Sequence, residues 1–178
     1  MTDTMTPAQR HHCMSHIRSR NTKPELLARR WLWRHGYRYR LNVKSVPGKP
    51  DIVLRQYRTA IFVNGCFWHG HNVKWSVDDV ENSTCCKIPH TNREFWVSKI
   101  RRNQQRDREN YDVLYRNGWN VVVIWECQLK PAAIEHTMRE VEMLLNENLL
   151  SRYRRIQPVP YSNDEENIGL PMAAEDGV

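Results

Sequence analysis

The sequence predicts an α/β fold, and three observations lead to this prediction. Residues 37–44 alternate strictly between apolar and polar side chains, as expected of a half-buried strand. Short apolar runs that have the length of buried strands lie at residues 51–54, 59–64 and 119–125. Two longer segments, residues 91–117 and the segment from Pro131 onward, repeat their apolar residues every three or four positions, which is typical of amphipathic helices.

The length and composition bound the class of protein. A chain of 178 residues with 40% hydrophobic residues fits one domain plus a tail. No apolar run approaches the roughly 18 residues that cross a bilayer, and the N-terminus lacks the apolar core of a signal peptide. We therefore expect a cytoplasmic protein with no membrane partner. In such a protein, five cysteines indicate metal binding or reactive thiols before disulfides.

The net charge of +7 is unevenly distributed. Residues 156–178 contain five acidic residues and no Lys or Arg, so residues 1–155 alone carry a charge of +12. This division predicts a basic domain over residues 1–155 and a flexible acidic tail over residues 156–178. A domain this basic indicates a polyanionic partner, most often nucleic acid, although charge alone leaves simple solubility as an alternative.

The first third of the chain predicts two helices and a meander of strands. Thr6-Pro7 is a typical start for a basic helix over residues 7–19. Thr22 and Glu25 fit a capping box, so Glu25 is by pattern a cap residue of a helix that ends near His35. The strands then follow at short spacing, at residues 37–44, 51–54 and 59–64, which favours antiparallel pairing. Asp51 begins an apolar strand after proline, where it either caps a turn or reaches a cation at the rim of the sheet.

The segment Ile61–His71 concentrates chemistry more than any other part of the chain. A short apolar strand ends at Gly65, and a thiol, two aromatic rings and two imidazoles follow within six positions: Cys66, Phe67, Trp68, His69 and His71. Thiolates and imidazoles bind metals, imidazole moves protons, and exposed aromatic rings stack on bases. We interpret this segment as the floor of an active site joined to the edge of a metal site.

The helix over residues 91–117 carries an acid on its buried face. Thr91 to Glu94 form a second capping-box pattern, and Gly118 follows the last turn. The inward face consists of residues three or four positions apart: Trp96, Ile100, Asn103, Asp107, Tyr111 and Leu114. An unpaired charge on such a face is costly, so Asp107 is expected to be salt-bridged or functional.

The remaining cysteines suggest a zinc site that pins the long polar loop 72–90. Cys66 and His71 lie close in sequence, whereas Cys127 follows the strand at 119–125, and Cys85 and Cys86 end the loop. One residue from each place completes a Cys3His set, the composition of a closed structural zinc site. The alternative is that these cysteines are buried, inert thiols.

A second set of residues has the composition of a nuclease site. Asp51 could hold Mg²⁺, His69 could take a proton, and Asp107 and Glu25 add two further acids. Phosphodiester cleavage needs a cation to offset developing charge and a base to activate water. The set spans residues 25–107, so its spacing alone does not establish a site.

The motifs of residues 10–130 resemble one enzyme family. They are Pro47-Gly-Lys-Pro-Asp-Ile-Val53, Ile61-Phe-Val-Asn-Gly-Cys-Phe-Trp-His69, Arg93-Glu-Phe-Trp96, Lys99-Ile100, Asn103, Arg106-Asp107, and Gly118-Trp119 to Val-Ile-Trp-Glu-Cys127. In their order and spacing they resemble the very-short-patch-repair (Vsr) DNA mismatch endonucleases. The resemblance implies a restriction-endonuclease-like fold, with a mixed central β-sheet flanked by helices.

The resemblance also implies an activity. Enzymes of this kind recognise a T:G mispair left by deamination of 5-methylcytosine in double-stranded DNA. They nick the thymine strand on the 5′ side of the mispaired base and use Mg²⁺. The expected protein is thus a monomeric DNA repair endonuclease of the bacterial cytoplasm, associated with the nucleoid when bound. A cytosine-5 methyltransferase and mismatch-repair proteins are possible functional partners.

The roles implied by the resemblance fall on named residues. Asp51 resembles the metal-binding aspartate, His69 the general base, and Asp107 and Glu25 the acids that hold metal-bound water and the histidine. The other implied groups are a wedge beside the mispair (Phe67, Trp68, Trp96), residues lining the mispair (Met14, Ile17, Lys99, Asn103) and zinc ligands (Cys66, His71, Cys127).

The chain departs from the family pattern at three points. Asn64 stands where some members have a histidine, and an amide cannot take a proton from water. Val73 stands where the remaining zinc cysteine is often found, so Cys85 or Cys86 must replace it. The strand 60–64 also lacks the Glu-x-Lys of generic restriction-like nucleases, which favours His69 in place of the lysine. Two rival interpretations are a restriction-type endonuclease that cuts paired DNA and an inactive zinc-stabilised DNA-binding module.

Overall fold

The computed structural model describes residues 20–75, 80–81 and 83–154, together with residues 6, 8, 9 and 12. Most of the expected N-terminal helix, including Met14 and Ile17, and the whole acidic tail lie outside the described residues. The helices are α2 (Lys23–Arg34), α3 (Cys66–His69), α4 (Arg93–Arg116), the 3₁₀ turn η1 (Glu126–Leu129) and α5 (Ile134–Arg154). The strands are β1 (Ile52–Leu54), β2 (Thr59–Asn64), β3 (Lys74–Trp75), β4 (Val80–Glu81) and β5 (Asn120–Trp125). No described helix is long and apolar enough to cross a bilayer.

The central sheet is mixed and has the strand order β1-β2-β5. β1 pairs antiparallel with β2, with Ile52 opposite Ile61. β2 pairs in parallel with β5, so that Asn64 lies opposite Trp125 at their last residues. Because the carboxyl ends of both parallel strands meet at one edge, the segments that follow them, α3 and η1, begin side by side.

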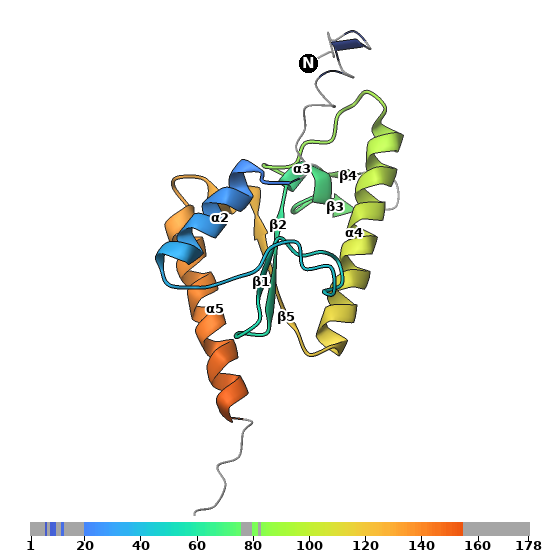
Figure 1. Cartoon of the computed structure of the whole chain (residues 1–178). Coiled ribbons are helices and arrows are strands. Elements are labelled where there is room, and N and C mark those ends of the chain that lie inside the picture. The colour runs from blue at the N-terminus through green and yellow to red at the C-terminus, as the bar shows by residue number, and fades with distance from the viewer. Residues whose placement is uncertain are drawn as a thin grey trace, which may run out of the picture.

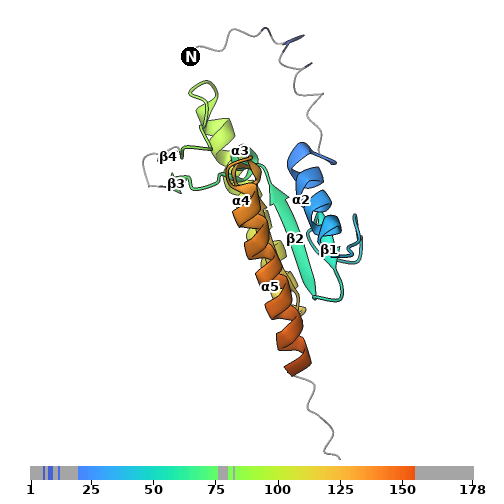
Figure 2. The same ribbon diagram turned by 90° about the vertical axis from the view of Figure 1, so that its left-hand side faces the viewer.

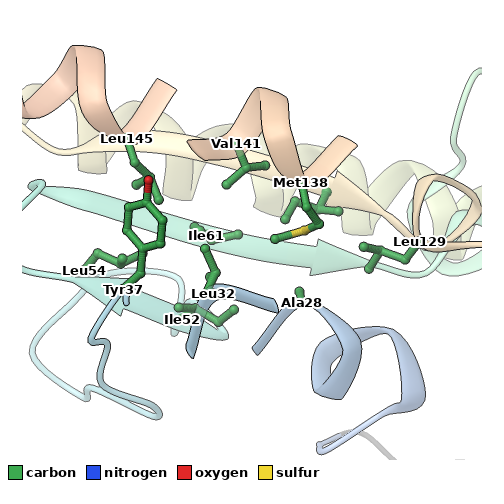
Figure 3. Close-up of a cluster of buried hydrophobic side chains, with 11 residues drawn as sticks. Ala28, Leu32, Tyr37, Ile52, Leu54, Ile61, Leu129, Met138, Val141 and Leu145 are labelled. Atoms are coloured by element: carbon green, nitrogen blue, oxygen red, sulfur yellow. The ribbon is translucent and has the colours of Figure 1, made fainter. Parts of the chain in front are cut away.

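Helices cover both faces of the sheet, so the expected mixed sheet flanked by helices is confirmed. In Figure 1, α2 and α5 lie on one side of the strands and α4 lies on the other, and Figure 2 shows the same layers after a quarter turn. One core fills the α2–α5 side, and Figure 3 shows Leu32, Ile61 and Met138 at its centre. A second core, which includes Phe62 and Leu114, fills the α4 side. Apolar residues therefore alternate between the two faces along β2, as its period of two requires.

Three local expectations need correction, and one further segment takes a form that the sequence did not predict. The alternating segment 37–44 is not a full strand, because only Arg40 pairs with Val53 and the left-handed backbone of Asn42 (φ +51°) interrupts the extension. The capping box at Thr91 does not form. Asn92 precedes α4 with φ +54° and makes no side-chain cap. The segment after Gly65 is a single helical turn, α3, and the polar loop contains the short antiparallel pair β3–β4.

Candidate active site and metal cluster

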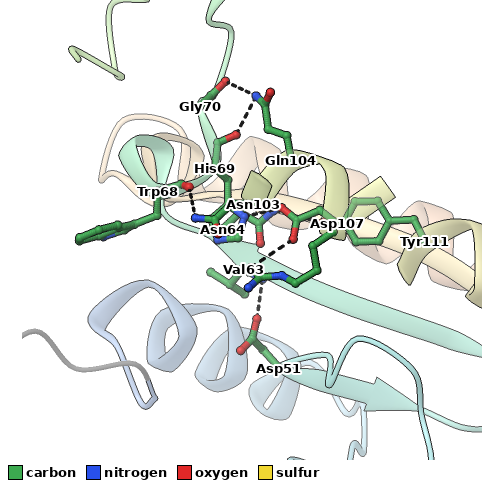
Figure 4. A network of polar contacts seen from close by, with 11 residues as sticks. Asp51, Val63, Asn64, Trp68, His69, Gly70, Asn103, Gln104, Asp107 and Tyr111 are labelled. Carbon is green, nitrogen blue, oxygen red and sulfur yellow. Dashed lines mark hydrogen bonds and ion pairs between the residues drawn. The ribbon is translucent and has the colours of Figure 1, made fainter. Parts of the chain in front are cut away.

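An open cleft of about 910 Å³ lies at the edge of the sheet where β2 ends. Its wall includes the whole predicted nuclease set, Glu25, Asp51, His69 and Asp107, together with Asn64, Trp68 and Lys99. These residues come from α2, the start of β1, the end of β2, α3 and α4. Figure 4 shows how Asp51 and Asp107 approach from opposite sides of the end of β2. The fold thus gathers acids, an imidazole and an aromatic ring around one hollow.

Asp51 is held at the rim of the sheet by the neighbouring strand. Its Oδ2 accepts a hydrogen bond from the backbone N–H of Val63 at 2.8 Å. Burial raises the pKa of Asp51, and the hydrogen bond from Val63 opposes this shift only in part. A bound cation would relieve the desolvation of such a carboxylate. In the part of the chain that the structure describes, no cluster of three metal-binding side chains forms around Asp51. One carboxylate completed by water and phosphate oxygens is nevertheless a common Mg²⁺ environment, so the residues present fit this ion.

The shortest side-chain contact among the residues that line the cleft joins His69 and Asp107. His69 Nδ1 lies 2.5 Å from Asp107 Oδ2. This contact occupies Nδ1, so Nε2 is the ring nitrogen left for a proton from a group in the cleft. The other carboxylate oxygen of Asp107 lies 3.7 Å from the Arg106 guanidinium. The inward acid on α4 is therefore paired, and its main partner is the imidazole.

Side-chain amides of α4 hold the α3 turn that carries His69. Gln104 Nε2 donates to the carbonyls of His69 and Gly70 at 3.0 and 3.1 Å. Asn103 Nδ2 donates to the carbonyl of Trp68 at 2.8 Å, a contact that the sequence did not predict. Gln104 was missed altogether because it lies one position beside the inward stripe of α4. Its only sequence signal is this position next to Asn103, on the helix that faces α3.

Glu25 lines the cleft, but its carboxylate oxygens accept hydrogen bonds from residues within and just before its own helix. It is only 4% exposed, and its carboxylate accepts hydrogen bonds from the Asn21 N–H, the Thr22 hydroxyl and the Arg29 guanidinium. The Thr22 hydroxyl in turn accepts a hydrogen bond from the Glu25 N–H, so the predicted cap of α2 is confirmed. Asp107, not Glu25, is the acid in contact with His69.

A group of aromatic rings lies beside the cleft, and one of them, Trp68, lines its wall. Phe67, Trp68 and Trp96 pack edge to face, with ring centroids 5.1 to 6.0 Å apart. The Lys99 ammonium lies 5.3 Å from the ring centroid of Trp68 and 5.4 Å from that of Trp96. Phe95, part of the motif Arg93-Glu-Phe-Trp96 but without a predicted role, adds a ring that is 57% exposed. Phe67 and Trp96 also pack on a small core, so the group is anchored on one side and open on the other.

A cluster of four metal-binding side chains lies behind the cleft. The ligand atoms of Cys66, His71, Cys85 and Cys127 all lie within 4.8 Å of one another. The Nδ1 atom of His71 is 3.1 Å from the sulfur of Cys85 and 3.3 Å from that of Cys127. Cys86 is not part of this cluster, since it is fully buried in a small apolar core. The sequence left Cys85 and Cys86 open as alternatives, and the structure brings Cys85 into the group.

A bound cation would offset the burial that disfavours thiolates in this cluster. Burial raises the pKa of the Cys66 thiol to about 12. For Cys85, burial also favours the thiol, but hydrogen bonds from Ser83, Cys66 and Cys127 outweigh it and lower its pKa. Burial lowers the pKa of His71, which favours the neutral imidazole that metals bind. Three sulfurs and one imidazole around a common centre fit Zn²⁺ in composition.

The chain is similar in sequence to several known proteins. Residues 2–75 match the family described as DNA mismatch endonuclease Vsr. The chain is 45% identical over 136 residues to the type II nicking enzyme V.NmeAIP of Neisseria meningitidis, covering 75% of this chain and 89% of that protein. It is 38% identical over 142 residues to the type II nicking enzyme V.XorIIP of Xanthomonas oryzae, covering 79% and 97%. It is 37% identical over 130 residues to the DNA mismatch endonuclease Vsr of Escherichia coli, covering 73% and 77%.

Proposed function

Because the chain belongs to the Vsr family of DNA mismatch endonucleases and is a DNA endonuclease of that kind, we propose that it nicks DNA at T:G mispairs. The cut falls in the thymine strand, 5′ of the mispaired base, and starts the repair of deaminated 5-methylcytosine. The name of the Escherichia coli relative supports the mismatch substrate. The names of two other relatives support a single-strand cut.

The observation that carries the proposal is the pairing of His69 with Asp107 in the cleft that Asp51 also lines. His69 Nε2 takes a proton from the attacking water. Asp107 fixes the ring through Nδ1 and stabilises the positive charge that the imidazole then acquires. Asp51 binds Mg²⁺, which supplies positive charge against the negative charge that develops on the phosphate. Glu25, fixed by Arg29, adds negative charge on the same side of the cleft as Asp51.

The aromatic group supplies discrimination in this proposal. A T:G wobble pair stacks less well than a Watson–Crick pair. A wedge must overcome an unstacking cost of roughly a few kcal/mol, and this cost is lower at the mispair. Phe67, Trp68 and Trp96 insert beside the mispair, and Lys99 contacts the DNA next to them. Asn103 has a second role in holding Trp68, which fits a residue at the base of the wedge. Met14 and Ile17 complete the group as proposed from the sequence.

The other parts of the proposal concern metals and setting. A structural Zn²⁺ is held by Cys66, His71, Cys85 and Cys127. The mixed sheet has a restriction-endonuclease-like topology. Residues 1–155 act as one endonuclease domain and residues 156–178 as an acidic tail. The protein works as a monomer in the bacterial cytoplasm, downstream of a cytosine-5 methyltransferase and together with mismatch-repair proteins.

A strand-specific nicking assay with Mg²⁺ tests the proposed substrate. Duplexes with a T:G mispair in a methylated-cytosine context are compared with the same duplexes fully paired. The expected result is a nick confined to the thymine strand of the mismatched duplex. Cleavage of both duplexes would support a restriction-type enzyme of the same fold, and tight binding without cleavage would support an inactive DNA-binding module.

A further inference from the structure

The contact between Asn64 and Tyr111 in the cleft has no part in the mechanism so far. Asn64 is the last residue of β2 and is 5% exposed. Tyr111 lies one helical turn after Asp107 on α4, and both Asn64 and Tyr111 line the cleft. Figure 4 shows the two side chains beside Asp107 at the end of β2. The pair therefore lies among the groups that face the DNA strand to be cut.

The hydrogen bonds of this pair leave one donor unused. Asn64 Nδ2 donates to the Tyr111 oxygen at 3.1 Å. A phenol oxygen that accepts one hydrogen bond can still donate its own hydrogen. Within residues 20–75 and 83–154, the Tyr111 hydroxyl has no other hydrogen-bond partner in the protein. Asn64 thus orients a hydroxyl group whose hydrogen is available to a ligand in the cleft.

The surroundings of Tyr111 keep that hydrogen in place. Burial raises the pKa of Tyr111 to about 12, and the nearby carboxylates of Asp107 and Asp51 act in the same direction. The phenol is therefore protonated at neutral pH. It cannot act as a base, but it can act as a donor.

A neutral donor suits this position between two acids. A lysine or arginine here would form an ion pair with Asp51 and compete with a cation for its carboxylate. A phenol makes a hydrogen bond to a phosphate oxygen without that competition. Asp51 and Asp107 have no hydrogen atoms to donate to an anionic phosphate, whereas Tyr111 adds a neutral donor to the cationic donors Lys49, Lys99 and Arg106 that also line the cleft.

We propose that the Tyr111 hydroxyl, oriented by Asn64, donates a hydrogen bond to a non-bridging oxygen of the phosphodiester that is cut. Tyr111 is then a catalytic residue that contacts the substrate, and Asn64 is its positioning residue. This assignment gives Asn64 a function that needs no proton transfer. It rests on the phosphodiester-nicking function proposed above.

Single-turnover nicking by Tyr111→Phe tests the assignment. The variant keeps the ring, which packs on Phe62 with centroids 5.0 Å apart, and removes only the hydroxyl. We expect nicking to slow by about 10- to 100-fold, the effect of losing a hydrogen bond to a charged group, with DNA affinity and melting temperature little changed. Tyr115→Phe is the matched control, because Tyr115 lies one turn further along α4 and is 58% exposed.

Sulfur substitution at the phosphate separates a direct contact from a structural effect. Each non-bridging oxygen is replaced by sulfur, a weaker hydrogen-bond acceptor, in separate diastereomers. For one diastereomer, sulfur should slow nicking by the wild-type protein, and this slowing should be several-fold smaller in Tyr111→Phe. Replacing Mg²⁺ with Mn²⁺ should not restore the wild-type rate on that diastereomer. Asn64→Ala should slow nicking by a similar factor, with little further loss in the double variant.

Two results would overturn the assignment. One is nicking by Tyr111→Phe at the wild-type rate. The other is slow nicking by Tyr111→Phe in which sulfur at either non-bridging position slows the variant as much as it slows the wild-type protein. The hydroxyl would then act by stabilising the fold and not by contacting the phosphate. All variants are compared on whichever duplex the wild-type protein nicks. A wrong substrate assignment would therefore appear in the wild-type control and would not be mistaken for loss of the Tyr111 contact.

Discussion

The Nδ1 atom of His69 on the short helix α3 lies 2.5 Å from the carboxylate of Asp107 on the long helix α4. The contact joins two segments that are 38 residues apart in sequence. It fixes which ring nitrogen faces the cleft, because the carboxylate accepts a hydrogen bond only from a protonated Nδ1. The reactivity of the imidazole therefore depends on a residue that does not need to contact DNA.

Asp107→Asn should keep the fold and lower the nicking rate by about 10²- to 10⁴-fold. The amide can donate to Nδ1, which would leave the hydrogen on Nε2 and abolish its ability to accept a proton. Single-turnover nicking with saturating enzyme measures the effect. Asp112→Asn, on the exposed side of the same helix, is the control and should nick normally. Equal rates for the two variants would remove Asp107 from the mechanism.

Asp51→Asn should lower nicking by at least about 10³-fold, since a bound cation contributes several kcal/mol to such reactions. It should leave binding of mismatched DNA intact. The amide oxygen can still accept the hydrogen bond from Val63, so the start of β1 is not disturbed. Nicking rates and binding isotherms in Mg²⁺ measure the two properties, and normal nicking would exclude Asp51 as the metal ligand.

The same substitution should raise the melting temperature in Mg²⁺-free buffer at neutral pH. Burial raises the pKa of Asp51, so the ionised carboxylate destabilises the folded state relative to the unfolded chain. This penalty is fully present above the raised pKa, shrinks as the pH falls below it, and is gone below the ordinary pKa of 3.8, because the carboxyl group is then protonated in both states. The difference in melting temperature between Asp51→Asn and the wild-type protein should therefore shrink toward acidic pH. A constant difference would point to another cause.

Cys85→Ser and Cys86→Ser should differ sharply, although the two residues are adjacent. Loss of Cys85 removes one of four ligands, so the bound metal should fall below one equivalent and the melting temperature should drop by about 10 °C. Cys86 lies in an apolar core, so Cys86→Ser should keep its metal while losing some stability. Elemental analysis of the purified proteins distinguishes them. Full metal content in Cys85→Ser would refute the assignment of the fourth ligand.

Trp68→Ala should weaken the preference for mismatched over paired DNA by about 1–3 kcal/mol, the value of a stacked aromatic ring. The measurement is the ratio of the dissociation constants for the two duplexes. Trp33→Ala is a suitable control, because Trp33 is 54% exposed on α2 and does not line the cleft. If Trp68→Ala keeps the wild-type ratio, the ring is part of the core and not a wedge.

Much of the layered fold follows from the local pattern of the sequence. The apolar runs at β2 and β5 contribute to the cores on both faces of the sheet, and the periodic segment of α4 packs one face against it, so pattern and structure agree. The segment 37–44 has the same alternation, but Asn42 takes a left-handed conformation and Leu41 is 39% exposed, so pairing stops after one bridge. Whether an alternating segment pairs depends on a neighbour that the local pattern does not contain.

The site was predictable in its acids and imidazole but not in its supporting contacts. Asp107 stood out because a charge on the inward face of a helix needs a partner. Gln104 and Tyr111 are uncharged, and their contacts with the carbonyl of His69 and the amide of Asn64 depend on how α4 crosses the end of β2. The choice of Cys85 over Cys86 depends on the path of a loop in which neighbouring side chains point to different places.

Because α3 is a single turn of four residues, substitutions outside the cleft should also affect catalysis. A single helical turn does not hold its shape alone, so His69 depends on anchors at both ends: Cys66 in the metal cluster and the amide of Gln104. A genetic screen for loss of nicking should therefore recover changes at Cys85 and Cys127 as readily as changes at His69. If the cluster holds the proposed zinc ion, loss of that ion or oxidation of its thiols should silence the enzyme with its catalytic residues intact.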